Sequence, residues 1–134
     1  MRKLLTLIAG SLLVGGAAQA KPADREAELD RALQGRVAGE PVDCISLHRV
    51  RSSRIIEDTA ILYDAGGVIY VNRPDNGAEQ LDRHDTMVNR LYAGDRLCSI
   101  DTVTMVEPVS GTFRGVVFLG EFVPYRRVQT GSAD

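Results

Sequence analysis

From Cys44 onward the chain is a series of short apolar runs, each ended within a few residues by glycine, proline, asparagine or aspartate. Runs of this length and punctuation are typical of β-strands rather than helices. The clearest pair is Thr59–Tyr63 and Val68–Val71, joined by Asp64-Ala65-Gly66-Gly67, whose glycines can adopt the positive φ angles of a tight hairpin turn. The pattern predicts a mainly β fold: a compact antiparallel barrel or sandwich of about seven to eight short strands, with one short N-terminal helix.

The expected strands follow from alternation of apolar and polar residues or from uninterrupted apolar runs between turn residues. They are Ile45–His48, Ser53–Ile56, Thr59–Tyr63, Val68–Val71, Thr86–Tyr92, Ser99–Val106, Gly115–Leu119 and Phe122–Arg127. The β domain is therefore expected to span residues 44–128, followed by a small, polar and flexible tail over residues 129–134.

The segment before the strands, residues 21–43, is expected to form a short helix and a connector. Asp24 suits the start of the helix, and Gly35 suits its end. Leu29 and Leu33 form a narrow apolar stripe, so the helix either packs against the β domain or remains a mobile leader. The strand Val68–Val71 is apolar on both sides of its pleat, which requires a cover on each face. That helix is one candidate cover, and the mate in a homodimer is another.

Residues 1–20 have the layout of a secretory signal peptide. Arg2 and Lys3 precede an apolar run from Leu4 to Val14, and the segment ends in Ala18-Gln19-Ala20. The small residues Ala18 and Ala20 match an A-x-A cleavage site, and the apolar run is too short to span a bilayer. We therefore expect a periplasmic or secreted protein that is cleaved after Ala20 and has no transmembrane segment in its mature form.

The two cysteines, Cys44 and Cys98, both lie in the expected β domain. In an exported domain such a pair is predicted to form a disulfide, here closing a loop of about 55 residues. The alternative is a redox-active or metal-binding thiol pair. The spacing is far from C-x-x-C, which favours the structural bridge.

Charge and aromatic content exclude some classes of partner. The formal net charge is −2, and loss of Arg2 and Lys3 makes it more negative. A nucleic-acid-binding protein is usually basic, and the chain has no tryptophan to stack on bases. We therefore expect no nucleic-acid partner.

A basic segment is the first candidate binding site. If the strand continues beyond His48, Arg49 and Arg51 lie on one face, and Arg54 follows closely. Arginine suits bidentate contacts with carboxylate or phosphate, so Arg49, Arg51 and Arg54 form a candidate patch for an anionic ligand. The alternative is a solvated strand end that protects the sheet from edge-to-edge aggregation.

The second candidate is a polar loop in which His84 lies between two carboxylates, Asp82 and Asp85. Imidazole and carboxylate together suit acid–base catalysis or a metal site, although a solvated loop of mixed charge explains the same residues. No nucleophile elbow accompanies them. The sequence therefore assigns no catalytic residue, no metal ligand and no cofactor, and favours a protein without enzymatic activity.

Several segments also resemble those of a known group of proteins. They are Cys44-Ile45, Arg51–Ile56, Thr59–Tyr63, Ile69–Arg73, Leu97–Asp101 and Phe118–Pro124. In these segments the chain resembles a family of small exported bacterial proteins with a single β-rich domain of unknown function. The resemblance implies a one-domain envelope protein, and it supplies no substrate, cofactor or catalytic residue.

Export, a disulfide, a two-sided apolar strand and the lack of a catalytic motif together favour a non-catalytic binding or interaction module. Its expected partner is a protein or another component of the cell envelope. Two alternatives are also compatible with the sequence: an inhibitor of a secreted hydrolase, and a small hydrolase with its site near Asp82, His84 and Asp85.

Overall fold

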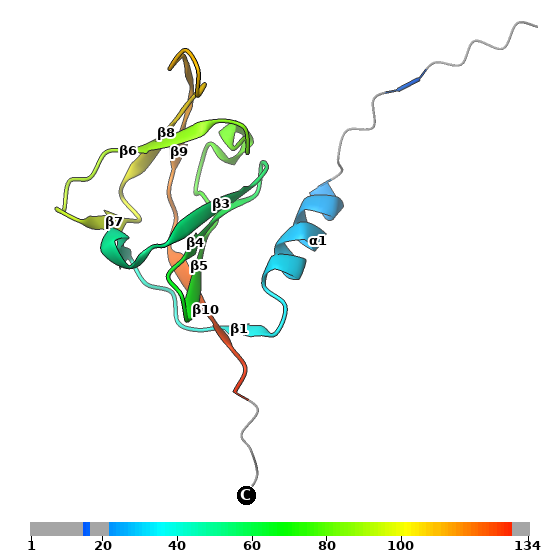
Figure 1. Ribbon diagram of the computed structural model, residues 1–134, viewed down its shortest axis with the longest axis vertical. Helices are drawn as coiled ribbons and strands as arrows, with labels where there is room; N and C mark the ends of the chain where they lie inside the picture. The colour runs from blue at the N-terminus through cyan, green and yellow to red at the C-terminus, as the bar shows by residue number, and fades with distance from the viewer. Residues whose placement is uncertain (1–14, 17–21, 130–134) are drawn as a thin grey trace, which may run out of the picture.

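The computed structural model describes residues 15–16 and 22–129 and has one helix and ten short strands in this part of the chain (Figure 1). The helix and strands are α1 (Pro22–Ala32), β1 (Arg36–Ala38), β2 (Cys44–Ser46), β3 (Ser52–Ile56), β4 (Ala60–Asp64), β5 (Val68–Asn72), β6 (Thr86–Asn89), β7 (Arg96–Cys98), β8 (Thr102–Val106), β9 (Phe113–Phe118) and β10 (Phe122–Arg127), with single 3-10 turns η1 (Leu47–Arg49) and η2 (Ala78–Gln80). The prediction of a mainly β chain with one short N-terminal helix is confirmed. The predicted signal peptide with its cleavage site, and the tail from residue 130 on, lie outside the described residues.

The strands form three antiparallel sheets. The largest has the order β1-β10-β5-β4-β3, a second has the order β6-β8-β9, and β2 pairs with β7 alone. Each sheet is open, because no strand pairing in the described part of the chain closes it into a ring. Of the two architectures considered from the sequence, the closed barrel is therefore not formed.

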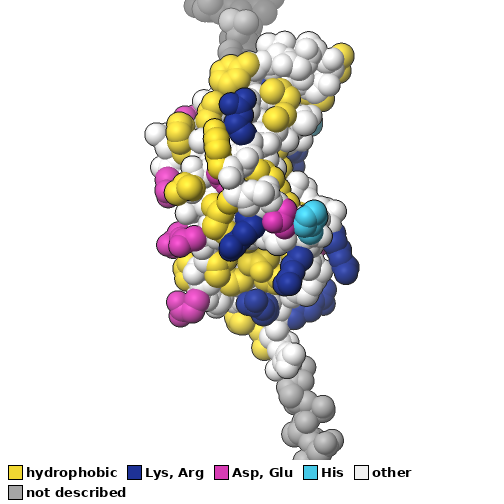
Figure 2. Space-filling view, turned by 90° about the vertical axis from the view of Figure 1, so that its left-hand side faces the viewer, with side chains coloured by type: hydrophobic (Ala, Val, Ile, Leu, Met, Phe, Trp, Pro, Cys, Tyr) yellow, Lys and Arg dark blue, Asp and Glu magenta, His cyan; other side chains and the backbone are white. Residues whose placement is uncertain are grey.

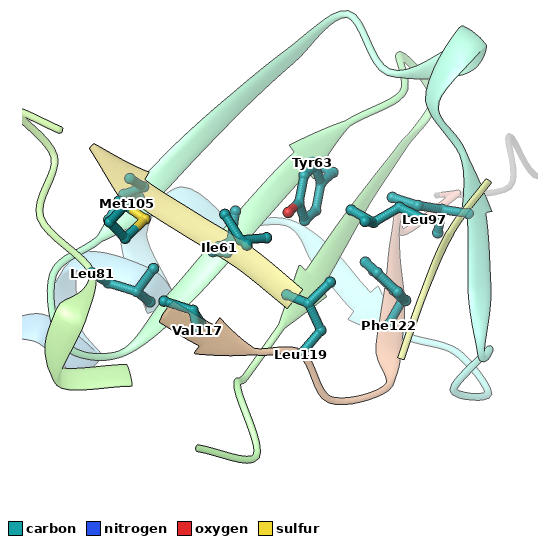
Figure 3. Packing of buried hydrophobic residues seen from close by; sticks show 11 residues of the cluster. Ile61, Tyr63, Leu81, Leu97, Met105, Val117, Leu119 and Phe122 are labelled. Carbon is teal, nitrogen blue, oxygen red and sulfur yellow. The ribbon is translucent and has the colours of Figure 1, made fainter. Parts of the chain in front are cut away.

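The main core lies between the five-stranded and three-stranded sheets. Alternate residues of strand β4, Ile61 and Tyr63, point into it and meet Met105 of β8 and Val117 of β9 (Figure 3). The rings of Tyr63 and Phe122 pack at a tilt, with their centroids 5.9 Å apart. Each large apolar side chain buried in this way contributes about 1.5–3 kcal/mol, so the contact between the sheets dominates the stability of the domain.

The opposite face of the five-stranded sheet is covered by α1. Leu29 and Leu33 pack on a second cluster that includes Ile56, Leu62 and Val71. The helix ends at Ala32 and is followed by a turn that closes at Gly35, whose φ of 73° is in the left-handed region that glycine adopts readily. The two-sided apolar strand is thus explained within one chain, since α1 covers one face of β5 and the main core covers the other.

The predicted hairpin at residues 64–67 is confirmed. Gly66 has a φ of 87°, and its N–H donates to the Asp64 side chain at 2.8 Å. The strand count is higher than predicted because β1 and β7 have only three residues each. Their apolar content is too low to distinguish them from a connector in the sequence. The predicted strand Ile45–His48 ends early, because η1 begins at Leu47.

Neither α1 nor the 3-10 turns, the helical elements of the described residues, is long and apolar enough to cross a membrane.

Candidate functional site

The two cysteines face each other across β2 and β7. Cys44 and Cys98 are directly paired in the strand register, with their Cα atoms 4.0 Å apart, and a disulfide joins them. The N–H of Cys98 donates to the buried Asp101 carboxylate at 2.7 Å. The bridge holds the two-stranded sheet together and leaves no free thiol in the protein.

The strand that would place Arg49 and Arg51 on one face does not continue through them. Arg49 lies in η1, and β3 begins only at Ser52, so the alternation of a strand does not apply to either residue. The Arg51 guanidinium lies against Gly66, and Arg54 donates to Glu28 of α1 at 3.3 Å. Figure 2 shows arginines gathered low on one face of the molecule, with acidic side chains along the opposite margin.

The polar loop before β6 brings together a different set of residues from the one predicted. A carboxylate oxygen of Asp82 and an imidazole nitrogen of His84 lie within 4.8 Å of each other and of a carboxylate oxygen of Glu57, in the turn between β3 and β4. Asp85 points elsewhere, with one oxygen 3.8 Å from Nε of Arg114. Sequence reasoning missed Glu57, because nothing in the sequence relates the β3–β4 turn to a loop 25 residues later.

A groove of about 500 Å³ lies between β3 and β6, the edge strands of the two main sheets. Its walls come from α1, from β3, and from the end of the polar loop with the start of β6. The lining residues are Glu28, Ser53, Arg54, Ile55, Arg83, Asp85, Thr86 and Met87. The groove is thus the open side of the sandwich, where the two sheets leave their edges unpaired.

The backbone of β3 is directed into this groove. At the β4–β5 hairpin the N–H of Ala65 donates to the carbonyl of Val68 at 2.9 Å. Backbone hydrogen-bonding groups alternate in direction along a strand. In β4 the N–H and C=O groups of odd-numbered residues therefore point toward β5, and those of even-numbered residues point toward β3. The intervening β3 residues, Ser53 and Ile55, therefore point their N–H and C=O groups away from β4, at the unpaired edge.

The same reasoning applies to β6. Just after β8 the N–H of Glu107 donates to the carbonyl of Thr112 at 2.8 Å. By alternation, the backbone N–H and C=O groups of the odd-numbered residues of β8 point toward β9. The backbone groups of the even-numbered residues of β8 point toward β6, where these residues pair with Thr86 and Val88. The backbone groups of Met87 consequently point away from β8. Since Met87 also lines the groove, unpaired backbone groups border it from both sheets.

The charges around the groove form a balanced network. Glu28 accepts from both Arg54 and Arg83, and Arg83 also donates to Glu57 at 2.9 Å. Partial burial opposes the ionisation of Glu28, but the hydrogen bonds from the two guanidinium groups outweigh it and lower its pKa below the ordinary value. The lining has two arginines and two carboxylates, with Asp85 as the second acid. It therefore has no net charge with which to select a ligand.

Comparison of the chain with protein-family models, with curated proteins and with solved structures finds no match, so no family is assigned to it.

Proposed function

We propose that this protein is an extracytoplasmic binding module that accepts an extended segment of another protein between β3 and β6. The observation that carries the proposal is the groove between two strand edges whose backbone groups are unpaired. An extended segment that adds to a sheet edge satisfies such groups with main-chain hydrogen bonds. Most native edges are blocked by charge, by proline or by a covering segment, whereas these two border a common hollow.

The dimensions favour a short segment. A five-residue strand such as β3 is about 16 Å long, so a partner paired along it contributes about five residues. The half-buried Met87 and the Ile55 side chain supply apolar contacts beside the backbone hydrogen bonds. Because the charged lining residues balance, recognition rests on backbone pairing and shape, and the affinity is expected to depend little on salt.

The place of action is part of the proposal. The Cys44–Cys98 disulfide supports it, since such bonds persist in oxidising compartments outside the cytoplasm. The N-terminal segment with Ala18-Gln19-Ala20 gives the same indication from the sequence. A periplasmic or secreted location is the one in which this fold retains its cross-link.

The test uses peptides selected against the whole protein from a random twelve-residue library, with their affinities measured by fluorescence anisotropy. In a Ser53→Pro variant the groove loses one outward N–H, while the hydrogen bonds from β3 to β4 are retained. We expect binding to weaken about tenfold, because a carbonyl of the peptide is left buried without a donor.

The matched control is Ala38→Pro on β1, the opposite edge of the same sheet. The N–H of Gly39 donates to the carbonyl of Pro124 at 2.7 Å, so alternation directs the N–H of Ala38 away from β10. Ala38→Pro should leave peptide affinity unchanged. Equal affinity of the wild type and Ser53→Pro would overturn the proposal. A homodimer that is lost in Ser53→Pro would also overturn it, since a second copy would then occupy the groove.

A further inference from the structure

We infer that Glu57, Asp82 and His84 form a binding site for one divalent transition-metal ion, with zinc as its best fit. Their metal-binding atoms, two carboxylate oxygens and one imidazole nitrogen, all lie within 4.8 Å of one another. They come from two separate parts of the chain: the turn after β3 and the loop before β6. Convergence of three such ligands from two segments is the arrangement that a mononuclear site requires.

The two segments are held together by the protein itself. The N–H of Asp58 donates to the carbonyl of Leu81 at 3.2 Å, which ties the turn to the start of the loop. Within the turn, the Thr59 hydroxyl donates to the Glu57 carbonyl at 2.9 Å. The backbone positions of the ligands are thus set before any ion binds, and only the half-buried side chain of Glu57 and the exposed side chains of Asp82 and His84 have to adjust.

Each carboxylate is also oriented by a second contact. Oε1 of Glu57 accepts from Arg83 Nε at 2.9 Å, and Oδ1 of Asp82 accepts from the His84 N–H at 2.8 Å. Each group therefore keeps its other oxygen for a metal. Hydrogen bonds of this outer kind orient ligands in known metal sites, and their loss there lowers affinity about 10–100-fold.

The ligand set selects the class of ion. Imidazole disfavours calcium and magnesium, which prefer oxygen ligands, whereas one nitrogen and two carboxylate oxygens suit zinc. Zinc bonds of about 2.0–2.2 Å place tetrahedral ligand atoms roughly 3.4 Å apart, and rotation of the three side chains closes the remaining gap of up to ~1.4 Å. A fourth position is left for water or for a group from a partner.

The site would connect the two walls of the groove. Glu57 directly follows β3, and His84 lies between Arg83 and Asp85, which line the groove beside β6. A bound ion would hold the β3 and β6 edges at a fixed spacing. This consequence rests on the proposed function, whereas the binding of metal does not.

The experiment is titration of the whole, untagged protein with zinc chloride by isothermal calorimetry after removal of metal with a chelator. We expect one zinc per chain. Affinity should fall at least tenfold in His84→Ala and also in Glu57→Gln, which is remote in sequence and keeps the side-chain shape. His48→Ala is the matched control, because His48 also lies near a carboxylate, 3.6 Å from Asp95. Its affinity should equal that of the wild type.

Absence of saturable zinc binding would overturn the site, as would a Glu57→Gln variant that binds zinc as the wild type does. Substitution of zinc by cobalt adds an independent readout, since its visible spectrum should indicate a single nitrogen- and oxygen-ligated ion and should disappear in His84→Ala. Peptide affinities measured in chelator test the groove separately. Failure of one idea is therefore distinguishable from failure of the other.

Discussion

Removal of the disulfide should cost this domain a large share of its stability. Cys44 and Cys98 are separated by 54 positions, so the bond closes a loop of about 55 residues in the unfolded chain. The loop-closure entropy for that length corresponds to about 4 kcal/mol at room temperature. A domain of this size is typically stable by only about 5–15 kcal/mol. The double variant Cys44→Ala/Cys98→Ala is therefore expected to fold but to unfold far more easily.

Urea unfolding followed by circular dichroism measures this loss. With a slope near 2 kcal/mol per molar urea, a loss of about 4 kcal/mol lowers the midpoint by about 2 M. Wild-type protein in reducing agent should match the double variant, because the cross-link is then absent while both cysteine side chains remain. Reduced and oxidised proteins that unfold at the same urea concentration would refute the reasoning.

Three further predictions concern single side chains. Asn72 is buried, and its side chain forms two hydrogen bonds with the backbone of Gly120. Asn72→Ala should therefore lower the free energy of unfolding, measured in urea, by about 2–4 kcal/mol, and an unchanged free energy would contradict this prediction. The buried Tyr63 hydroxyl has no hydrogen-bond partner in the described part of the chain. Tyr63→Phe should therefore leave the free energy of unfolding unchanged or raise it by ~1 kcal/mol, and a clear loss of stability would contradict this prediction. Hydrogen bonds from the Ser110 hydroxyl and from the N–H groups of Ser110 and Val109 lower the pKa of Glu107 to about 2. The contribution of the Glu107 carboxylate to stability should therefore be fully present above about pH 4.5 and be lost as the pH falls toward 2. An NMR titration of Glu107 that gives its ordinary pKa would contradict this.

The parts of the fold that the sequence predicted are those determined locally. The β4–β5 hairpin follows from Gly66, which has the positive φ that the turn requires, and α1 follows from Asp24, which lies in its first turn, and from Gly35 after its end. The three-residue strands β1 and β7 could not be recognised in the same way. They exist because the distant strands β10 and β2 pair with them, and such pairing leaves no mark in the sequence of a three-residue strand.

The candidate site was harder to predict from the sequence, for a related reason. Cys44 and Cys98 could be paired because the chain has only two cysteines. Asp82 and His84 stood out as neighbours, but their partner Glu57 joins them only when the β3–β4 turn packs beside the loop. The groove depends on which strand edges stay unpaired, a property of the whole topology.

The most direct test of the central claim is amide hydrogen exchange measured by NMR on the free protein and on its complex with a selected peptide. The account predicts that the amides of Ser53, Ile55 and Met87 exchange rapidly in the free protein, because they point from unpaired edges into the groove. In the complex all three should become protected, while the amide of Ala38 on the opposite edge should not change. Protection of these amides already in the free protein, or peptide binding that leaves them unprotected, would contradict the account.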